Sequence, residues 1–387
     1  MQTQYQFQTA DKIIAGAYRF EQLAVELQKT IHAHRVLIVT QPSMVNKSQF
    51  ETMKHNLSDN QIEFDFTVSI QPEPTIANIE NTFEETVRGK NWDAIIGIGG
   101  GSVLDAVKIL AVLNDESQSI EEMLENGVQS KGLPTILIPT TSGTGSEVTP
   151  NAIVTIPDQQ LKVGIVSPYF LPELVIIDPV LTLTLPKEIT AATGMDAFTH
   201  ALESYISIKA NPISDMFALE AIRRISKSIV PTYLDGSSLE DRENLLIGSM
   251  YGGMALTSAG TAAVHALAYP LGGTFHITHG VANSMLLPHV MDVNQEAITT
   301  KLVNVAEAMN LPKLQNDEAT ASSVVEEIKR LTNKLHIPQD LQSFGVKEQD
   351  IKALAEAAFN VKRLLNNNPK PLNIPEIENI YRKLIEV

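Results

Sequence analysis

Four short apolar runs in the first half of the chain place the strongest constraint on its fold. They span Arg35 to Thr40, Asp93 to Gly99, Thr135 to Pro139 and Glu173 to Asp178. Amphipathic stretches such as Ser102 to Leu113 lie between them. A strand that is apolar along its whole length is buried on both faces, which is typical of a parallel sheet covered by helices on either side. The first half therefore predicts an α/β domain built on a parallel sheet.

The second half follows a different period. After the segment Asp178 to Pro186, apolar residues recur at helical spacing, as in Pro212 to Tyr233 and Ala319 to Leu335, and we expect helices throughout. A chain of 387 residues is also too long for one hydrophobic core. We therefore predict an α/β domain over residues 1–181 and an all-helical domain over residues 182–387. The early segment Tyr5 to Gly16 is interpreted either as an edge hairpin that pairs across a dimer or as a simple edge strand.

Charge and composition narrow the partners and the location. The formal net charge of −16 argues against nucleic acid and anionic membranes as partners. No apolar run approaches the roughly 18 residues that a membrane-spanning helix needs. The N-terminus lacks the basic and apolar segments of a secretory signal, and the chain contains no cysteine, which excludes disulfides and thiolate zinc sites. We expect a cytoplasmic protein.

A glycine triplet closes the second apolar run and opens a helix. In "GIGGGSVLDAVK", Gly99, Gly100 and Gly101 let the backbone approach a phosphate, and Ser102 adds a hydroxyl donor beside the free N–H groups of the helix start. Asp105 is less expected next to a phosphate, but its carboxylate can cap the helix or accept a hydrogen bond from a ribose or an amide. A tight turn between strand and helix explains the same glycines equally well.

A hydroxyl-rich loop, "PTTSGTGSEVTP", follows the next apolar run. It carries Thr140, Thr141 and Thr144 around two glycines. Such a loop can simply cap a helix. Two such loops at the carboxyl ends of strands, where α/β sheets bind their ligands, nevertheless favour a dinucleotide crevice. No G-x-G-x-x-G sequence occurs near the first strand, so the usual dinucleotide fingerprint is absent.

The helical half carries groups that suit a metal ion. Asp196 and His200 lie four residues apart in "AATGMDAFTHALESYI", so both project from one helical face. An Asp–His pair at this spacing can equally be structural. Further histidines follow in "AVHALAYPLGGTFHITHGVANSMLLPHV", namely His265, His276, His279 and His289. A carboxylate and three imidazoles suit a borderline divalent ion such as Fe²⁺ or Zn²⁺. His289 is interpreted as structural, and His276 as a residue of the pocket or its mouth.

These motifs together resemble those of a known family. The pieces "GGGSVLDAVK", "PTTSGTGSEVTP", "TAATGMDAFTHALE" and "HALAYPLGGTFHITHGVANSMLLPHV" occur in the order and spacing of the iron-containing (group III) alcohol dehydrogenases, which include lactaldehyde reductases and 1,3-propanediol dehydrogenases. The resemblance covers essentially the whole chain. It implies a Rossmann-like dinucleotide-binding domain, a helical metal-binding domain and a homo-oligomer, either a dimer or a larger ring. It also implies a set of four metal ligands: Asp196, His200, His265 and His279.

The resemblance also assigns cofactor contacts. Gly99 to Ser102 would hold the pyrophosphate of NAD or NADP. Further contacts to its phosphates, ribose and nicotinamide would come from Thr140, Thr141, Thr144, Asn151 and Lys162. Gln41 stands where many NAD-preferring members carry an acidic residue, so the choice between NAD and NADP stays open.

Two more positions depart from the family pattern. Tyr269 stands where a second histidine is often found, and it offers a hydrogen bond without titrating near neutrality. A proton relay would run through Tyr269, through His276, or through water and ribose hydroxyls. In addition, "EPT" from Glu73 to Thr75 replaces the Asn-Pro-Thr often seen in the adenine-side loop.

The resemblance implies hydride transfer between a small primary alcohol or diol and the nicotinamide, with the metal acting on the oxygen of the alcohol or aldehyde. A lyase or cyclase of the dehydroquinate synthase type needs cations around an anionic substrate, and the stretch Gly252 to Asn283 has no Lys or Arg. A glycerol dehydrogenase-like enzyme and a non-catalytic dinucleotide binder are two further candidates. The alcohol itself stays open. We expect its pocket to be lined by Phe198, Leu256, Phe275 and His276.

Overall fold

The computed structural model describes residues 4–156 and 161–385, and these residues form two compact units. The sheet unit comprises residues 8–141 and 145–184, and the helical unit comprises residues 4–7, 142–144 and 185–385. The chain thus changes from one unit to the other after Thr184. Three residues of the hydroxyl-rich loop, Ser142–Thr144, belong to the helical unit although their neighbours on both sides belong to the sheet unit.

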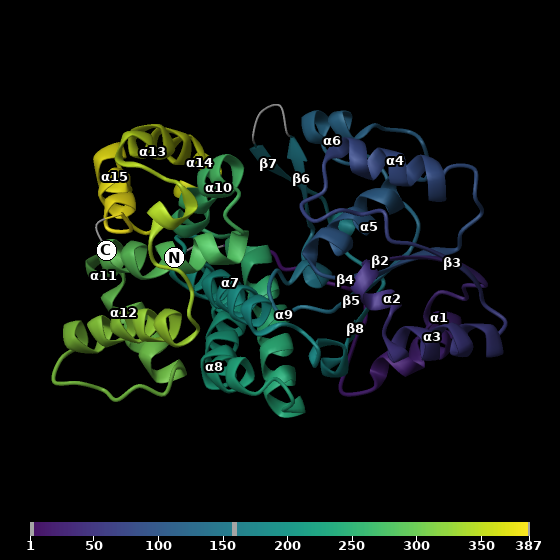
Figure 1. The fold of residues 1–387 in the computed structure, drawn as a ribbon, viewed down its shortest axis with the longest axis horizontal. Coiled ribbons are helices and arrows are strands. Elements are labelled where there is room, and N and C mark those ends of the chain that lie inside the picture. The colour runs from purple at the N-terminus through teal and green to yellow at the C-terminus, as the bar shows by residue number, and fades with distance from the viewer. Residues whose placement is uncertain (1–3, 157–160, 386–387) are drawn as a thin grey trace. The chain divides into compact units, whose positions relative to one another are not determined.

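The predicted parallel sheet is confirmed. Its six strands are all parallel and lie in the order β1-β8-β5-β4-β2-β3 (Figure 1). Each of the four apolar runs forms a strand within one residue of the predicted bounds. The strands are β1 (Ile13–Ala15), β2 (Arg35–Thr40), β3 (Glu63–Thr67), β4 (Ala94–Gly99), β5 (Thr135–Pro139) and β8 (Leu174–Ile177). The early segment supplies β1, which pairs in parallel with β8 at one edge of the sheet and is therefore an edge strand rather than a hairpin.

Helices cover both faces of this sheet, because successive residues of each buried strand point to opposite sides. Leu37 and Val39 of β2 pack into a core with α4 and α5, whereas Val36 and Ile38 pack into a second core with α1 and α3. The α-helices of the sheet unit are α1 (Leu23–Thr30), α2 (Pro42–Val45), α3 (Ser48–Asp59), α4 (Ile76–Thr86), α5 (Gly101–Leu113) and α6 (Ile120–Asn126). Short 3₁₀ helices lie at η1 (Arg19–Gln22), η2 (Ser146–Val148), η4 (Pro168–Phe170) and η5 (Pro179–Thr182).

An antiparallel hairpin that the sequence did not predict joins the sheet unit. Its strands β6 (Asn151–Ile156) and β7 (Leu161–Val166) pair with each other in a separate two-stranded sheet. The hydroxyl-rich loop before it ends in η2 rather than in an α-helix, so the alternative interpretation of this loop as the cap of an α-helix does not hold. Both hairpin strands mix apolar and polar residues, and only alternate residues of β6 are fully buried. Such half-buried strands lack the continuous apolar run that made the central strands recognisable.

The helical unit is built around α7 (Lys187–Ile206), which contacts α8, α9, α10 and α11. Along most of its length α7 is buried all round. The remaining helices are α8 (Pro212–Leu234), α9 (Leu239–Ala259), α10 (Ala263–Phe275), α11 (His279–Ala308), α12 (Asp317–Lys334), α13 (Ile351–Asn360), α14 (Lys362–Leu365) and α15 (Ile374–Arg382), with 3₁₀ helices at η6 (Leu341–Phe344) and η7 (Glu348–Asp350). Every strand that the structure describes lies in the sheet unit, as expected from the helical period of the second half.

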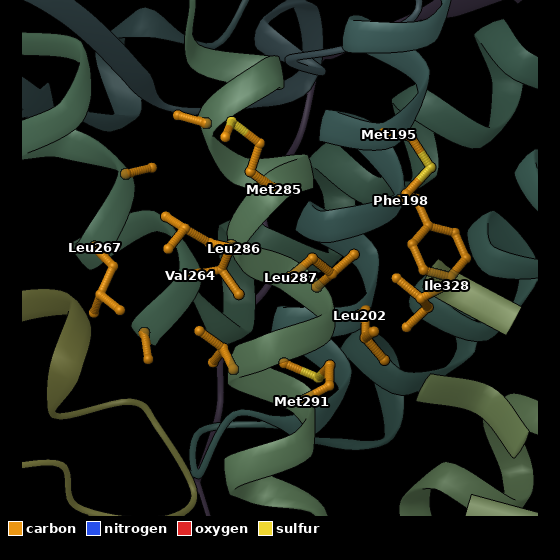
Figure 2. Packing of buried hydrophobic residues seen from close by; sticks show 14 of the residues in the cluster. Met195, Phe198, Leu202, Val264, Leu267, Met285, Leu286, Leu287, Met291 and Ile328 are labelled. Carbon is orange, nitrogen blue, oxygen red and sulfur yellow. The ribbon is translucent and has the colours of Figure 1, made fainter. Parts of the chain in front are cut away.

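Phe198 belongs to the core of the helical unit. Figure 2 shows its ring beside Ile328 of α12, with Met195 and Leu202 of α7 close by. Its side chain is fully buried among these apolar residues. The expectation that Phe198 lines a substrate pocket is therefore wrong, because a core position leaves no face for a ligand. Among the described residues, no helix is long and apolar enough to cross a membrane.

Candidate active site

Four predicted ligands come together in the helical unit. Asp196 and His200 lie one turn apart on α7, His265 lies near the start of α10, and His279 is the first residue of α11. One ligand atom from each of the four lies within 4.8 Å of the others. The Asp196 Oδ1 atom is 3.9 Å from His265 Nε2 and 3.8 Å from His279 Nε2. The Asp–His pair of the sequence motif thus points into the same small space as two histidines from other helices.

Close packing of α11 on α7 brings the ligands of these two helices together. Gly280 follows His279 directly, and a Cβ atom at Gly280 would lie 2.3 Å from the backbone oxygen of Ala192. Only glycine therefore allows the start of α11 to come this near to α7. A Cβ atom at Gly252 of α9 would likewise lie 3.1 Å from the backbone oxygen of Ala197 and 3.7 Å from His200 Cβ. These two glycines bring neighbouring helices onto the turn of α7 that carries Asp196 and His200.

The four ligands fit a divalent cation. Metal–ligand bonds of 2.0–2.2 Å in a tetrahedral site put neighbouring ligand atoms about 3.4 Å apart. The two separations from Asp196 Oδ1 exceed this value by about 0.4–0.5 Å, and every separation in the set is within 4.8 Å, so the side chains have to rotate inward to hold a cation. Asn283, one turn after His279 on α11, places its side-chain amide among the same ligand atoms. Its Nδ2 donates to Asp196 Oδ1 at 2.7 Å and lies 3.2 Å from His265 Nε2, while its buried Oδ1 has no hydrogen-bond partner among the described residues.

Hydrogen bonds on the far side of two rings direct their Nε2 atoms inward. The Nδ1 atom of His265 donates to Glu203 Oε2 at 2.6 Å, and the other Glu203 oxygen accepts from the Val264 backbone N–H at 2.6 Å. The His200 Nδ1 atom donates to the backbone oxygen of Gly143 at 3.3 Å. A ring that carries its proton on Nδ1 leaves Nε2 with a free lone pair, which is the form that binds a metal.

Sequence reasoning missed Glu203 and Asn283, although their spacing offered a signal. Glu203 lies three residues after His200, and Asn283 lies four residues after His279. Residues at these distances share a helical face. A buried polar side chain on the face that carries a metal ligand is therefore a candidate to support that ligand.

The electrostatics of the cluster favour a cation. Burial by itself raises the pKa of the Asp196 carboxyl, but the neighbouring histidines and the Asn283 amide outweigh it and hold the pKa below its usual range. Burial lowers the pKa of His200, which keeps this ring neutral. A neutral imidazole and an ionised carboxylate are the protonation states that metal binding requires.

The two residues considered for a proton relay occupy different settings. The Tyr269 ring lies 6.0 Å from the His279 ring, centroid to centroid, and burial raises the pKa of its phenol. The positive charge of Arg363 of α14 partly offsets this rise in pKa. His276 is exposed at the end of α10, in the left-handed region with φ of 55°, and lies outside the cluster of four ligand atoms. Arg363 therefore places a positive charge near Tyr269. It comes from a later part of the chain than the stretch Gly252 to Asn283, which itself has no Lys or Arg.

The sheet unit carries a second feature at the carboxyl edge of its strands. The chain runs from β2 outward to β3, then crosses back to β4 and continues in the opposite direction to β5 and β8. The reversal point therefore lies between β2 and β4, where open α/β sheets bind their ligands. Thr40 of β2 pairs with Ile98 of β4. Gln41 and the glycine triplet that begins at Gly99 therefore flank the reversal point.

This edge suits a dinucleotide phosphate. The α5 helix starts at Gly101 directly after β4, so its first backbone N–H groups face outward at the reversal point. A Cβ atom at Gly99 would lie 2.7 Å from the Val103 side chain, so only glycine fits at the end of this strand. At the end of the neighbouring strand β5, the buried Thr140 Oγ1 has no hydrogen-bond partner among the described residues. A buried hydroxyl without a protein partner can donate to the oxygen of a ligand.

Two of the residues considered as cofactor contacts, Asp105 and Asn151, are bonded inside the sheet unit. The Asp105 carboxylate accepts from the Ile153 backbone N–H at 3.0 Å and also binds Ser146 and the buried Lys108. The same lysine donates to the backbone oxygen of Asn151 at 2.6 Å. Asp105 and the Asn151 carbonyl therefore tie α5 to η2 and β6, and the carboxylate oxygens of Asp105 are occupied within the protein. Next to them, burial raises the pKa of Glu147 to about 7.

The remaining candidate contacts lie at the rim of the edge. Gln41 follows β2 and donates from Nε2 to Ser43 Oγ at 3.0 Å. Lys162 of β7 forms an ion pair with Glu73 at 2.5 Å. Thr141 is the last residue of the sheet unit before Ser142–Thr144. Thr144 is exposed and belongs to the helical unit.

Comparison with known proteins agrees with this geometry. The family description "Iron-containing alcohol dehydrogenase" matches residues 10–179, and "Fe-containing alcohol dehydrogenase family, C-terminal" matches residues 190–385. The chain is 38% identical over 366 residues to long-chain-alcohol dehydrogenase 1 of Geobacillus thermodenitrificans, a match that covers 93% of this chain and 92% of the relative.

Solved structures agree as well. A crystal structure of 1,3-propanediol oxidoreductase matches with a TM-score of 0.94 and 32% identity, covering 99% of this chain and 100% of that one. Sulfoacetaldehyde reductase from Bifidobacterium kashiwanohense in complex with NAD⁺ matches with a TM-score of 0.88 and 26% identity, covering 99% of each chain. The likeness extends over both units and over the motifs that carry the four ligands. The chain therefore belongs to the iron-containing alcohol dehydrogenase family.

Proposed function

We propose that this enzyme interconverts a small primary alcohol or diol and the corresponding aldehyde, using NAD or NADP and one divalent metal ion. The observation that carries the proposal is the convergence of one carboxylate and three imidazoles within 4.8 Å in a largely buried part of the helical unit. We propose Fe²⁺ as the metal, with Zn²⁺ as the second candidate, because this ligand set suits both ions. The lyase and the non-catalytic binder considered from the sequence are set aside, since the family is one of alcohol dehydrogenases.

When bound, the cation supplies a Lewis acid for the oxygen of the alcohol or aldehyde, and the dinucleotide supplies the hydride acceptor or donor. The protein's part is to hold both. Asp196 contributes the only negative charge of the ligand set, which leaves about one of the two charges of a divalent cation to act on the substrate. Glu203 and the Gly143 carbonyl keep two rings in the tautomer that binds the cation.

For the dinucleotide, we propose that the backbone from Gly99 to Ser102 holds the pyrophosphate at the start of α5. The unpartnered Thr140 hydroxyl and the neighbouring Thr141 would donate to its oxygens, and Lys162 would supply a positive charge. Gln41 neither repels nor strongly attracts a 2′-phosphate, so we propose that NAD and NADP are both used. Among the candidate relay residues, Tyr269 suits a hydrogen-bonding role beside His279, because a phenol is protonated at neutral pH and burial raises its pKa further.

We also propose a cytoplasmic homo-oligomer. The sheet ends in β1, a three-residue strand with one open edge, and an open edge can pair with a second copy of the chain. Sedimentation analysis at several protein concentrations measures this association. A monomer at every concentration would refute it.

A single substitution tests the metal assignment. His265→Ala should lose stoichiometric metal and turnover with aldehydes while keeping the circular dichroism spectrum of the wild type. His289→Ala is the matched control, because His289 is a partly buried histidine on α11 outside the ligand set. Turnover at the wild-type rate in metal-free His265→Ala would refute the proposal. A panel of aldehydes with NADH and NADPH, after chelation and reloading with iron or zinc, then identifies the substrate, the cofactor and the metal.

A further inference from the structure

Glu73 adopts an unusual backbone conformation beside the proposed dinucleotide site. It lies in the loop between β3 and α4, directly before Pro74, and its φ is 53°. Residues other than glycine rarely occupy this left-handed region, and Asn and Asp do so more readily than Glu. Such a conformation persists where the surrounding contacts fix it. The contacts that hold Glu73 in this conformation therefore indicate its role.

Two of these contacts attach the loop to the β6–β7 hairpin. Thr155 of β6 donates from Oγ1 to the Glu73 backbone oxygen at 3.0 Å, and its backbone N–H donates to the Pro74 oxygen at 2.9 Å. Lys162 stands directly opposite Thr155 on β7. Its Nζ lies 2.5 Å from Glu73 Oε1. One rung of the hairpin thus holds both the backbone and the carboxylate of Glu73.

A third contact places Glu73 at the glycine turn. Its backbone N–H donates to Ser102 Oγ at 3.1 Å, and Ser102 lies in the first turn of α5. The Lys162 side chain is 13% exposed whereas that of Glu73 is 49% exposed. The carboxylate is therefore the more exposed partner of the ion pair, and the backbone of the same residue is bonded to the helix start where a phosphate would bind.

We infer that Glu73 is an internal counter-ion that lowers the affinity of this enzyme for its dinucleotide. Its carboxylate neutralises Lys162 and places a negative charge near the site that the doubly charged pyrophosphate would occupy. An incoming dinucleotide has to compete with Glu73 for the lysine and meets the repulsion of the remaining carboxylate. This inference rests on the proposed dinucleotide function and concerns how tightly, rather than whether, the cofactor binds.

A weaker complex also releases its cofactor sooner, because differences in affinity between related complexes lie mostly in the dissociation rate. Release of product or cofactor limits turnover in many enzymes. Glu73 would therefore shorten the residence time of the dinucleotide between cycles. A neutral residue at this position is expected to tighten binding and, where release limits the rate, to reduce turnover at saturating substrate.

The test is a binding measurement that needs no turnover. NADH is titrated into the metal-loaded protein and its fluorescence is followed for the wild type, Glu73→Gln and Glu63→Gln. Glu63 is an exposed carboxylate at the opposite end of β3, so its replacement changes the net charge equally without touching the turn. We expect Glu73→Gln to lower the dissociation constant about 5- to 10-fold at low salt, and the gain to shrink near 1 M salt, where the Debye length falls to about 3 Å. Glu63→Gln should stay within about twofold of the wild type.

A second pair of variants separates charge from loop structure. Glu73→Asn removes the charge and fits the left-handed backbone better, so it tightens binding even if Glu73→Gln is poorly folded. Lys162→Gln should weaken NADH binding several-fold. Unchanged or weaker NADH binding by both Glu73 variants would overturn the inference, and so would unchanged binding by Lys162→Gln. Absence of NADH and NADPH binding by the wild type would instead refute the proposed function itself.

Discussion

Replacing Glu203 by glutamine keeps the size of a fully buried side chain but exchanges one hydrogen-bond acceptor for a donor. In the wild type, its two oxygens accept from the Val264 N–H and from His265 Nδ1, both at 2.6 Å. In Glu203→Gln, the amide NH₂ must face one of these donors. If it faces His265, that ring must move its proton to Nε2 and can no longer bind a cation through that atom. If it faces Val264, a buried N–H loses its acceptor at a cost of about 1–3 kcal/mol.

The expected result is a 10- to 100-fold loss of metal affinity, the range for removal of a group that orients a ligating histidine, or about 1.4–2.8 kcal/mol. The assay titrates Co²⁺ or Zn²⁺ into chelated protein in competition with a chromogenic chelator. The matched control is Glu188→Gln, an exposed carboxylate in the first turn of the same helix, which should leave the affinity unchanged. Metal affinity of Glu203→Gln within twofold of the wild type, together with an unchanged free energy of unfolding, would show that Glu203 does not hold His265 and Val264 as described.

Three further predictions follow from packing and burial. Gly280→Ala places a Cβ atom 2.3 Å from the Ala192 oxygen, so α11 must move away from α7, and we expect His279 to leave the site and metal affinity to fall at least tenfold in the same titration. Phe198→Ala removes a fully buried aromatic ring, and chemical denaturation should show a loss of about 3–5 kcal/mol; a loss below 1 kcal/mol would place the ring outside the core. Burial raises the pKa of Glu147 from 4.5 to about 7, so ionisation of this carboxyl lowers the stability of the folded protein as pH rises from 4.5 through 7. In urea denaturation, Glu147→Gln should be more stable than the wild type by up to about 3 kcal/mol at pH 8 and equally stable below pH 4.5. Equal stability of the two proteins at both pH values would contradict this.

Local pattern was sufficient for the large elements of the fold. Val36 to Val39 of the run Arg35–Thr40 are apolar and buried, and such short runs alternating with helical patterns indicate a parallel sheet, so the central strands and their parallel arrangement followed from the sequence. The hairpin β6–β7 and the edge strand β3 were not predicted, because their residues are only partly buried and their alternation is short. The burial that defines such strands depends on neighbours that are distant in sequence.

The ligand set was also predicted only in part from the sequence. Spacing along one helix was enough to put Asp196 and His200 on a common face, and residue chemistry was enough to name a divalent cation. Which further histidines join them depends on how α10 and α11 pack against α7, and the sequence alone left both His276 and His279 as candidates until the family resemblance separated them. In the structure His276 ends α10 in a left-handed conformation and is exposed, whereas His279 begins α11 beside Asp196.

The sequence by itself thus determined the class of each domain and the chemistry of the groups it offers, since periodicity and residue type are local properties. Tertiary structure alone decided which polar groups serve one another. Glu203 reaches His265 across 62 positions, Lys162 reaches Glu73 across 89, and Asp105 is consumed by Ser146 and Ile153 inside the sheet unit. Hydrogen bonds act over about 3 Å in space regardless of separation along the chain, so only the packed structure reveals them.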